Sequence, residues 1–442
     1  MEKLPYEIIL EIVDKCDFLS KIRLSGVNLL FYKKIQIFDL LNIPKNYSYK
    51  INSKILGQKK FRNLKKLNAK YNVTQNQISK LNLVELNASN NNKITNVSFM
   101  KNLKVLNANY TCGIDQNGFW QILFLQKQDL RQILRALHGI RGLDLVELNA
   151  IYNDKITDVS FMKNLKILNA DENGIDQNGI QGLDLIKLNV SYNKKIKNVL
   201  FMKNLKVLVA CGNECRIDQN GIRGLDLEEL DVSDNKKITN VSFMKNLKIL
   251  NAGNYCGIDQ KGIEDVDLVK FYVDNNKKIN NVTFMKNLKK LNATGNCGIN
   301  QNGILGLNLI ELSVSYNTKI NNVTFMKNLK KLNASHKCGI DQKGIQSLDL
   351  IELNVCGNKK ITNVAFMKKL KKLNIFDKCG VDQNGIEGLD LIEFDASDNE
   401  KITNVSFMKN LKKLNIYRNF NINKKDIEGL NLIKLSIEKK RL

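Results

Sequence analysis

Proline, histidine and tryptophan are scarce in this chain of 442 residues, which contains 2, 2 and 1 of them respectively. So few prolines and so little low-complexity sequence argue against long disordered linkers. No apolar run approaches the roughly 20 residues that a membrane-spanning helix needs, so no membrane association is predicted. The first residues lack the apolar stretch of a signal peptide, which indicates a cytoplasmic protein, or a nuclear one.

The groups that most enzymes use for catalysis are also scarce. The two histidines, His138 and His336, lie far apart in unrelated segments, and the sequence contains no evident nucleophile–base pair or phosphate-binding loop. We therefore expect a protein that is not an enzyme and that holds no cofactor.

Acidic residues are outnumbered, with 44 against 69 basic residues and a formal net charge of +25. Such an excess would attract nucleic acid or another anionic surface. The simpler interpretation is that lysine fills the solvent positions of a repeated sequence, and we favour it.

Leucine recurs with a fixed period from residue 64 almost to the end. A Leu-x-x-Leu-x-aliphatic unit returns every 20–21 residues, about 18 times. The units start at Leu64, Leu83, Leu103, Leu145, Leu165, Leu185, Leu205, Leu227, Leu247, Leu268, Leu288, Leu309, Leu329, Leu350, Leu370, Leu391, Leu411 and Leu432. This motif is typical of leucine-rich repeats and predicts an α/β solenoid, an arc of about 18 short rungs. A solenoid offers one long surface and no deep pocket, which favours binding over catalysis.

Asparagine stands eight residues after the first leucine of every second unit. Because the spacings alternate between 20 and 21, the repeating unit is a 41-residue pair of rungs. An inward amide can both donate and accept between successive turns, so we assign these asparagines a structural role. They are Asn91, Asn153, Asn193, Asn235, Asn276, Asn317, Asn358 and Asn399.

The back of each pair carries two further patterns. A Phe-Met dipeptide recurs in the first half, as at Phe243, and predicts a phenylalanine column packed in the core. The second half carries Gly-Ile-Asp-Gln-x-Gly-Ile, in which Asp341 would cap a single helical turn and Gly344 would end it. The string lacks the distal glutamate and the full aspartate series of a calcium loop, so no metal site is predicted.

Cysteines recur at the same place in alternate rungs. Cys215, Cys256, Cys297, Cys338 and Cys379 are 41 residues apart. Two strand spacings place such sulfurs roughly 10 Å apart, beyond the Cα separation of about 7 Å that a disulfide tolerates. We expect unpaired, semi-buried thiols and no zinc site.

The outward strand positions, two, four and six residues after each first leucine, form the candidate binding face. Position +2 alternates in sign from rung to rung, which neutralises the strip and disfavours nucleic acid, since that ligand would prefer a basic face with aromatics. Position +4 is mostly asparagine, with Tyr272 as an exception. Phe376 and Tyr417 interrupt a small polar column at +6. Together with Arg418, they are the predicted partner contact, because aromatics and arginine dominate binding hot spots.

An insertion of about 21 residues interrupts the repeats at about 119–139 and contains the only tryptophan, Trp120. Its leucines suit an amphipathic helix that docks on the solenoid or receives a partner, and Trp120 joins the predicted partner-binding residues. A degenerate repeat that fills one rung is the alternative.

The N-terminal segment has a different pattern. It begins Leu-Pro-Tyr-Glu-Ile, with proline at a helix start, and continues with two further short amphipathic stretches. Three such helices bury too little surface to stand alone, as expected for a module that a partner completes. A helical cap on the repeats is the alternative. The run Leu-Pro-x-Glu-Ile, Leu-Ser-Lys-Ile-Arg-Leu-Ser-x-Val and Phe-Tyr resembles an F-box. We therefore divide the chain into an F-box-like three-helix domain (1–40), a connector (41–60) and the solenoid (61–442).

The resemblance implies a function. F-box proteins dock on the Skp-type adaptor of a cullin–RING ubiquitin ligase, while their repeats select a target protein. The residues that would contact the adaptor are Leu4, Pro5, Ile8, Ile9, Ile12, Leu24 and Val27. The sequence departs from the family pattern at Lys15-Cys16, which replaces an apolar helix end, and at Phe31, where tryptophan is frequent. The Asn/Lys-rich repeats also resemble F-box/leucine-rich-repeat proteins of giant amoeba-infecting viruses, which implies a host cytoplasm. The alternative is a repeat scaffold or inhibitor that binds protein without ubiquitin transfer.

Overall fold

The computed structural model describes residues 61–70, 73–116 and 139–437, with positions 20, 21, 23, 37–41, 43, 51, 56 and 58 before them. Several predictions lie outside these residues: the three N-terminal helices with their adaptor-binding residues, and the insertion with Trp120. The chain divides into two compact units. Unit 1 comprises Met1–Ala210 with Glu214–Leu225, and unit 2 comprises Cys211–Asn213 with Asp226–Leu442.

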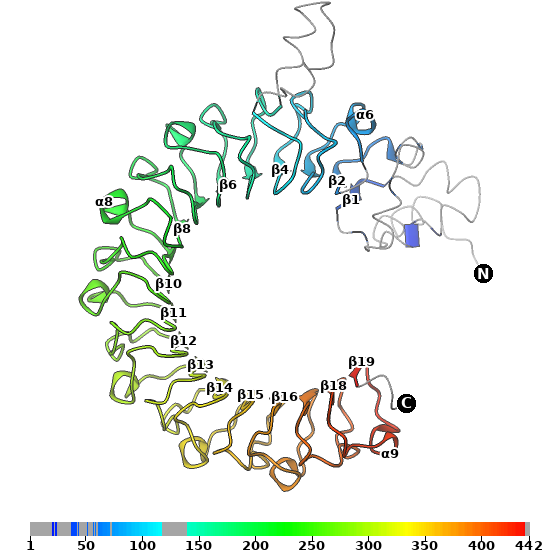
Figure 1. Ribbon diagram of the computed structural model, residues 1–442, viewed down its shortest axis with the longest axis vertical. Coiled ribbons are helices and arrows are strands. Elements are labelled where there is room, and N and C mark those ends of the chain that lie inside the picture. The colour runs from blue at the N-terminus through cyan, green and yellow to red at the C-terminus, as the bar shows by residue number, and fades with distance from the viewer. Residues whose placement is uncertain are drawn as a thin grey trace, which may run out of the picture. The chain divides into compact units, whose positions relative to one another are not determined.

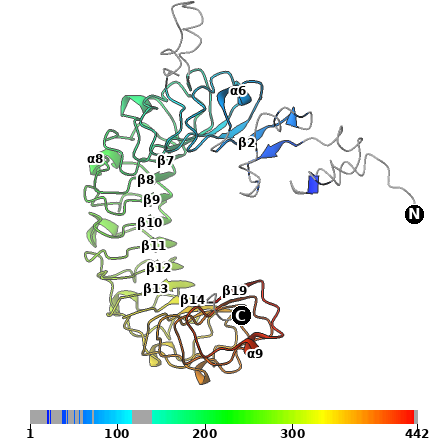
Figure 2. The same cartoon turned by 45° about the vertical axis from the view of Figure 1, so that its right-hand side comes forward.

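Each described rung contributes one short strand, and within each unit successive strands pair in parallel (Figure 1; Figure 2). In unit 1 the strands are β1 (Asp39–Leu40), β2 (Lys66–Asn68), β3 (Glu85–Asn87), β4 (Val105–Asn107), β5 (Glu147–Asn149), β6 (Ile167–Asn169), β7 (Lys187–Asn189) and β8 (Val207–Val209). In unit 2 they are β9 (Glu229–Asp231), β10 (Ile249–Asn251), β11 (Lys270–Tyr272), β12 (Lys290–Asn292), β13 (Glu311–Ser313), β14 (Lys331–Asn333), β15 (Glu352–Asn354), β16 (Lys372–Asn374), β17 (Glu393–Asp395), β18 (Lys413–Asn415) and β19 (Lys434–Ser436).

The strands follow the leucine motif. From β2 to β19 every strand begins at position +2 of one of the predicted units, and its middle residue, usually leucine, points inward. The predicted leucine-rich-repeat solenoid is therefore confirmed for the described residues. Strand β1 pairs with β2, Asp39 opposite Lys66, and was not predicted from the sequence.

Single helical turns occupy the back of the second-half units. They are α6 (Gln75–Ile78), η3 (Asn178–Ile180) and α8 (Gln219–Ile222) in unit 1, and η4 (Lys261–Ile263), η5 (Asn302–Ile304), η6 (Lys343–Ile345), η7 (Asn384–Ile386) and α9 (Lys424–Ile427) in unit 2. The cap is as predicted, since the Gly344 N–H donates to Asp341 Oδ1 at 3.0 Å.

The predicted role of Gly344 is wrong. This glycine lies inside the turn rather than at its end. A Cβ atom there would lie 2.0 Å from the Asn321 carbonyl oxygen of the adjacent rung, so the position needs glycine for close packing. The chain leaves the turn further on, where residue 347 adopts a positive φ of 69°.

The predicted phenylalanine core is also wrong, because the methionine that follows each phenylalanine takes the inward position. Met326 is fully buried, whereas Phe325 is half-buried and Phe366 is 40% exposed. The Met326 N–H donates to the Val323 carbonyl at 3.0 Å, which closes a tight turn. Residues three apart therefore share the inner side, and the intervening phenylalanine faces outward.

The asparagine column is confirmed as structural. Asn317 Nδ2 donates to the Ala293 and Ile299 carbonyls at 2.9 and 3.1 Å, and its Oδ1 accepts from the Lys319 N–H at 2.9 Å. All the predicted members are at most 2% exposed. These amides satisfy backbone groups that the non-helical loops leave buried.

Cysteine takes the asparagine place in the intervening rungs of unit 2. Cys297 lies one rung before Asn317, whose Nδ2 contacts its sulfur at 3.4 Å. The eight described cysteines form no disulfide, and seven of them are buried. Burial raises the pKa of the Cys297 thiol to about 11. The prediction that the cysteine column forms no disulfide is therefore confirmed for these residues.

Candidate binding face

The outward face of unit 2 carries the alternating charges that the sequence predicted at position +2. We call this row the charged strip; it consists of Lys290, Glu311, Lys331, Glu352, Lys372, Glu393 and Lys413. Position +2 is the first residue of each strand, and parallel pairing in register sets these residues side by side.

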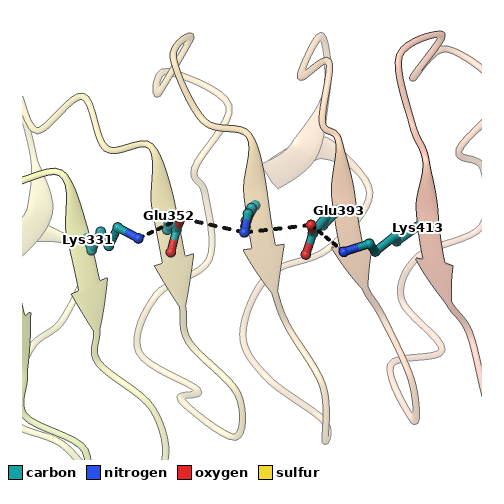
Figure 3. Close-up of polar contacts among 5 residues, drawn as sticks. Lys331, Glu352, Glu393 and Lys413 are labelled. Carbon is teal, nitrogen blue, oxygen red and sulfur yellow. Dashed lines mark hydrogen bonds and ion pairs between the residues drawn. The ribbon is translucent and has the colours of Figure 1, made fainter. Parts of the chain in front are cut away.

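Ion pairs link the members of the charged strip across the strands (Figure 3). Lys331 Nζ lies 2.9 Å from Glu352 Oε1, and Lys413 Nζ lies 2.8 Å from Glu393 Oε1. Lys372 lies between the two glutamates, 3.7 Å from Glu352 and 3.6 Å from Glu393. Glu352 and Glu393 are therefore each shared by two lysines, and the strip, with four lysines and three glutamates, is close to neutral.

The pKa shifts follow from these pairs. The hydrogen bond from Lys413 lowers the pKa of Glu393, and the hydrogen bond to Glu311 raises the pKa of Lys290. The partners are partly exposed, so water screens them and each pair stabilises the fold by at most about 1 kcal/mol. The order of charges along the strip consequently matters more for selecting a ligand than for stability.

A shallow hollow of about 630 Å³ lies on this face, over β13 to β19. Three kinds of residue line it: members of the charged strip, the apolar middle residues of the strands such as Leu353, and polar third residues such as Asn333 and Asn354. The arrangement offers donors and acceptors at regular spacing between apolar side chains, which suits an elongated ligand lying across the strands.

The structure brings together only part of the predicted partner contact. Phe376 and Tyr417 follow β16 and β18, are 37% and 43% exposed, and do not line the hollow. The Arg418 guanidinium lies 5.5 Å from the centre of the Tyr417 ring, as a cation–π contact does. Tyr272 belongs to β11 and lies five strands before β16, so it is not part of this group. A role for these residues in binding stays a prediction.

Unit 1 has no equivalent strip within its described residues. Lys66 and Glu85 pair at 3.0 Å, but apolar residues such as Val105 and Ile167 take position +2 in the strands that follow. Sequence reasoning missed a second feature there: Tyr110 and Tyr152 stack with ring centres 5.4 Å apart. Both tyrosines stand seven residues after the first leucine of their units, one residue beyond the positions that were predicted to face outward.

Metal ligands are not gathered in the described part of the chain, where no group of three or more histidine, cysteine or acidic side chains could hold an ion. The aspartates of the Gly-Ile-Asp-Gln loops instead cap the helical turns, as Asp259 does for the Gly262 N–H at 3.0 Å. Within the same residues, no helix has the length and apolar character that crossing a membrane requires.

By its fold the chain is a leucine-rich-repeat solenoid with a polar outward face. No family model and no curated protein matches it. Among solved structures, an internalin (InlF) from Listeria monocytogenes is 16% identical, with 76% of this chain and 81% of that chain covered and a TM-score of 0.34. TLR13 in a complex with ssRNA13 is 15% identical, with 91% of this chain and 61% of that chain covered and a TM-score of 0.47. The complex of Rad7 and Elc1 in yeast is 16% identical, with 97% of this chain and 95% of that chain covered and a TM-score of 0.37. Likenesses this distant carry no argument about partner or activity.

Proposed function

We propose that the chain is a noncatalytic protein-binding scaffold whose unit 2 holds its ligand on the charged strip. The observation that carries this proposal is the row of shared lysine–glutamate pairs that lines a hollow of about 630 Å³. A near-neutral row with fixed charge order can select a protein segment of complementary order. It gives little attraction to a phosphate backbone, which needs unpaired cations.

Within this proposal, the chain serves as the target-recognition subunit of a cullin–RING ubiquitin ligase. The support is the F-box-like sequence, in which Leu4, Pro5 and Ile8 would contact a Skp-type adaptor. A domain that binds the adaptor and a solenoid that binds a target would together bring the target to the ligase. The alternative is a repeat scaffold or inhibitor that binds its target without ubiquitin transfer. The resemblance to viral F-box/leucine-rich-repeat proteins would place either activity in a host cytoplasm.

Co-precipitation with a purified Skp-type adaptor separates these two functions. The wild type should bind the adaptor, and the double variant Leu4→Asp with Pro5→Ala should not. A matched control, Glu352→Gln with Glu393→Gln, alters only the charged strip and should bind the adaptor as the wild type does. If the wild type does not bind the adaptor, the ligase function is refuted. The alternative, a repeat scaffold that binds its target without ubiquitin transfer, would then stand.

Proximity labelling in the native cell tests whether the charged strip binds a target protein. The wild type should label a target protein, and the Glu352→Gln, Glu393→Gln variant should lose that target while still labelling the adaptor. If the strip variant labels the same set of proteins as the wild type, the charged strip is not the binding face.

A further inference from the structure

A second surface lies on unit 1, in the residues that directly follow the outward strand positions. We call it the aromatic–acidic ridge; it consists of Tyr110, Tyr152, Asp171, Glu172 and Tyr192. The three tyrosines follow β4, β5 and β7 and are 47%, 48% and 39% exposed. The Tyr110 and Tyr152 rings stack with an interplanar angle of 21°. Glu172 follows β6 and therefore lies between Tyr152 and Tyr192 in the order of rungs.

The backbone of the ridge is strained. Tyr110, Tyr152, Glu172 and Tyr192 have φ values of 56°, 55°, 40° and 52°, in the left-handed region. Asparagine, aspartate and glycine tolerate that region best, while bulky residues are uncommon there. In unit 2 the equivalent position is mostly one of the tolerant types: Asp234, Asn254, Asn275, Gly295, Gly357, Asp377 and Asp398. The tyrosines of the ridge therefore cost conformational energy, and strain of this kind concentrates at functional sites.

Among the residues that the structure describes, neither Asp171 nor Glu172 forms an ion pair. Asp171 Oδ1 is buried and accepts no hydrogen bond within the described chain. Burial first, and then the charge of Glu172, raise the pKa of Asp171. Two lysines of the β7 rung have other partners: Lys195 Nζ donates to the Gly174 carbonyl at 3.1 Å, and Lys194 pairs with Glu214 at 3.0 Å.

An independent orphaned acceptor lies beside the tyrosine stack. Asn109 precedes Tyr110, is only 7% exposed, and its Oδ1 accepts no hydrogen bond from the described residues. Asn109 and Asp171 occupy the same position, +6, in β4 and β6 rungs. A buried oxygen without a donor is unfavourable, so the free chain leaves two acceptors beside the ridge unsatisfied.

We propose that the aromatic–acidic ridge binds an arginine side chain in an extended segment of a partner protein. A guanidinium stacks on tyrosine faces, and its planar fork of N–H groups can donate to both oxygens of one carboxylate, as that of Glu172. Lysine offers a point charge without that fork and would bind less tightly. Nucleic acid could stack on the tyrosines, but its phosphates would meet Asp171 and Glu172. The ridge is a different surface from the charged strip of unit 2, so this proposal holds or fails independently of the proposed function.

Fluorescence anisotropy of the full chain with a labelled Gly-Arg-Gly-Arg-Gly peptide tests the proposal. The wild type should bind the peptide, and the same peptide with citrulline in place of arginine should bind at least about fivefold more weakly, because it keeps the shape and loses the charge. Glu172→Gln with Asp171→Asn should weaken arginine-peptide binding by about fivefold or more.

Tyr152→Asn separates binding from folding. Asparagine suits the left-handed backbone, so this variant should melt no lower than the wild type, yet it should bind the peptide more weakly by about threefold. The matched control is Tyr316→Asn, which removes a tyrosine at the equivalent position of unit 2, where φ is 58° and the ring stacks on His336. The control should keep wild-type affinity.

Three outcomes would overturn the proposal: the wild type does not bind the arginine peptide, citrulline binds equally well, or Tyr152→Asn and Tyr316→Asn behave alike. A labelled single-stranded RNA serves as the competing probe. If RNA binds and neutralising the two carboxylates strengthens that binding, the ridge is a nucleic-acid surface instead.

Discussion

Replacing Asn358 by alanine tests the asparagine column most directly. The Asn358 Nδ2 donates to the Ala334 and Ile340 carbonyls at 2.8 and 3.1 Å and contacts the Cys338 sulfur at 3.3 Å. Its Oδ1 accepts from the Lys360 N–H at 2.9 Å. The substitution leaves two carbonyls and one N–H without these partners. At about 1 kcal/mol for each group, the free energy of unfolding should fall by about 3 kcal/mol.

The assay is urea denaturation followed by circular dichroism, combined with hydrogen exchange, because repeats contact only their neighbours and can unfold in part. Exchange should accelerate first in the rungs on either side of Asn358. The matched control is Asn322→Ala, an exposed asparagine whose Oδ1 accepts from the Thr324 N–H at 2.9 Å, which should change stability by less than about 0.5 kcal/mol. Equal losses for the two variants would refute the reasoning, because they would show that burial of the amide does not matter.

Three further changes follow from the same geometry. Gly344→Ala places a Cβ 2.0 Å from the Asn321 carbonyl oxygen, so it should lower the urea midpoint more than Gly306→Ala, where φ is 74° and no atom lies within 4 Å; equal midpoints would contradict the packing role. The pKa of Glu393 is lowered from its usual 4.5, so its pairing stabilises the fold above that value and is lost as the pH falls through the folded pKa. The urea midpoints of the wild type and of Glu393→Gln should therefore approach each other as the pH is lowered. A difference between the two midpoints that does not change with pH would show that ionisation of Glu393 does not contribute to stability. The Cys338 thiol has a pKa of about 11 because it is buried, so thiol reagents at about pH 8 should label it slowly when folded and rapidly in urea; rapid native labelling would show that it is accessible.

The fold was predictable because the pattern that produces it is local. Leucines spaced by three residues and then alternating define a short strand with one inward side, and each repetition confirms the assignment. The buried role of Asn317 and the cap formed by Asp341 also follow from short-range chemistry, and both are present. The cysteines of the column form no disulfide because the repeat period sets the distance between them.

The errors occurred where neighbouring residues compete for one place. Phenylalanine is the larger apolar residue of each Phe-Met pair, yet the tight turn closed by the Val323 carbonyl assigns the inner position to Met326. Gly344 resembled a turn terminator, but contact with the adjacent rung explains it. The contact that requires Gly344 comes from a residue about 20 positions away, and the inward position of Met326 is set by the geometry of a turn. Neither effect can be read from a short stretch of sequence.

In the candidate sites, too, the sequence predicted the local pattern but not the contacts between rungs. Sequence alone predicted the alternating order of the charged strip, because position +2 is set by the leucine period. It did not predict that Lys372 lies between Glu352 and Glu393, or that Tyr110 stacks on Tyr152 across 42 residues of chain.

The period of the leucines thus determined, by itself, how many short strands form in the repeats and which side of each strand faces inward, since both depend on contacts within one rung. Only the tertiary structure decided which outward side chains meet, which acceptors lack donors and which rings stack. Those contacts form between rungs, and lateral packing and backbone conformation bring their residues together.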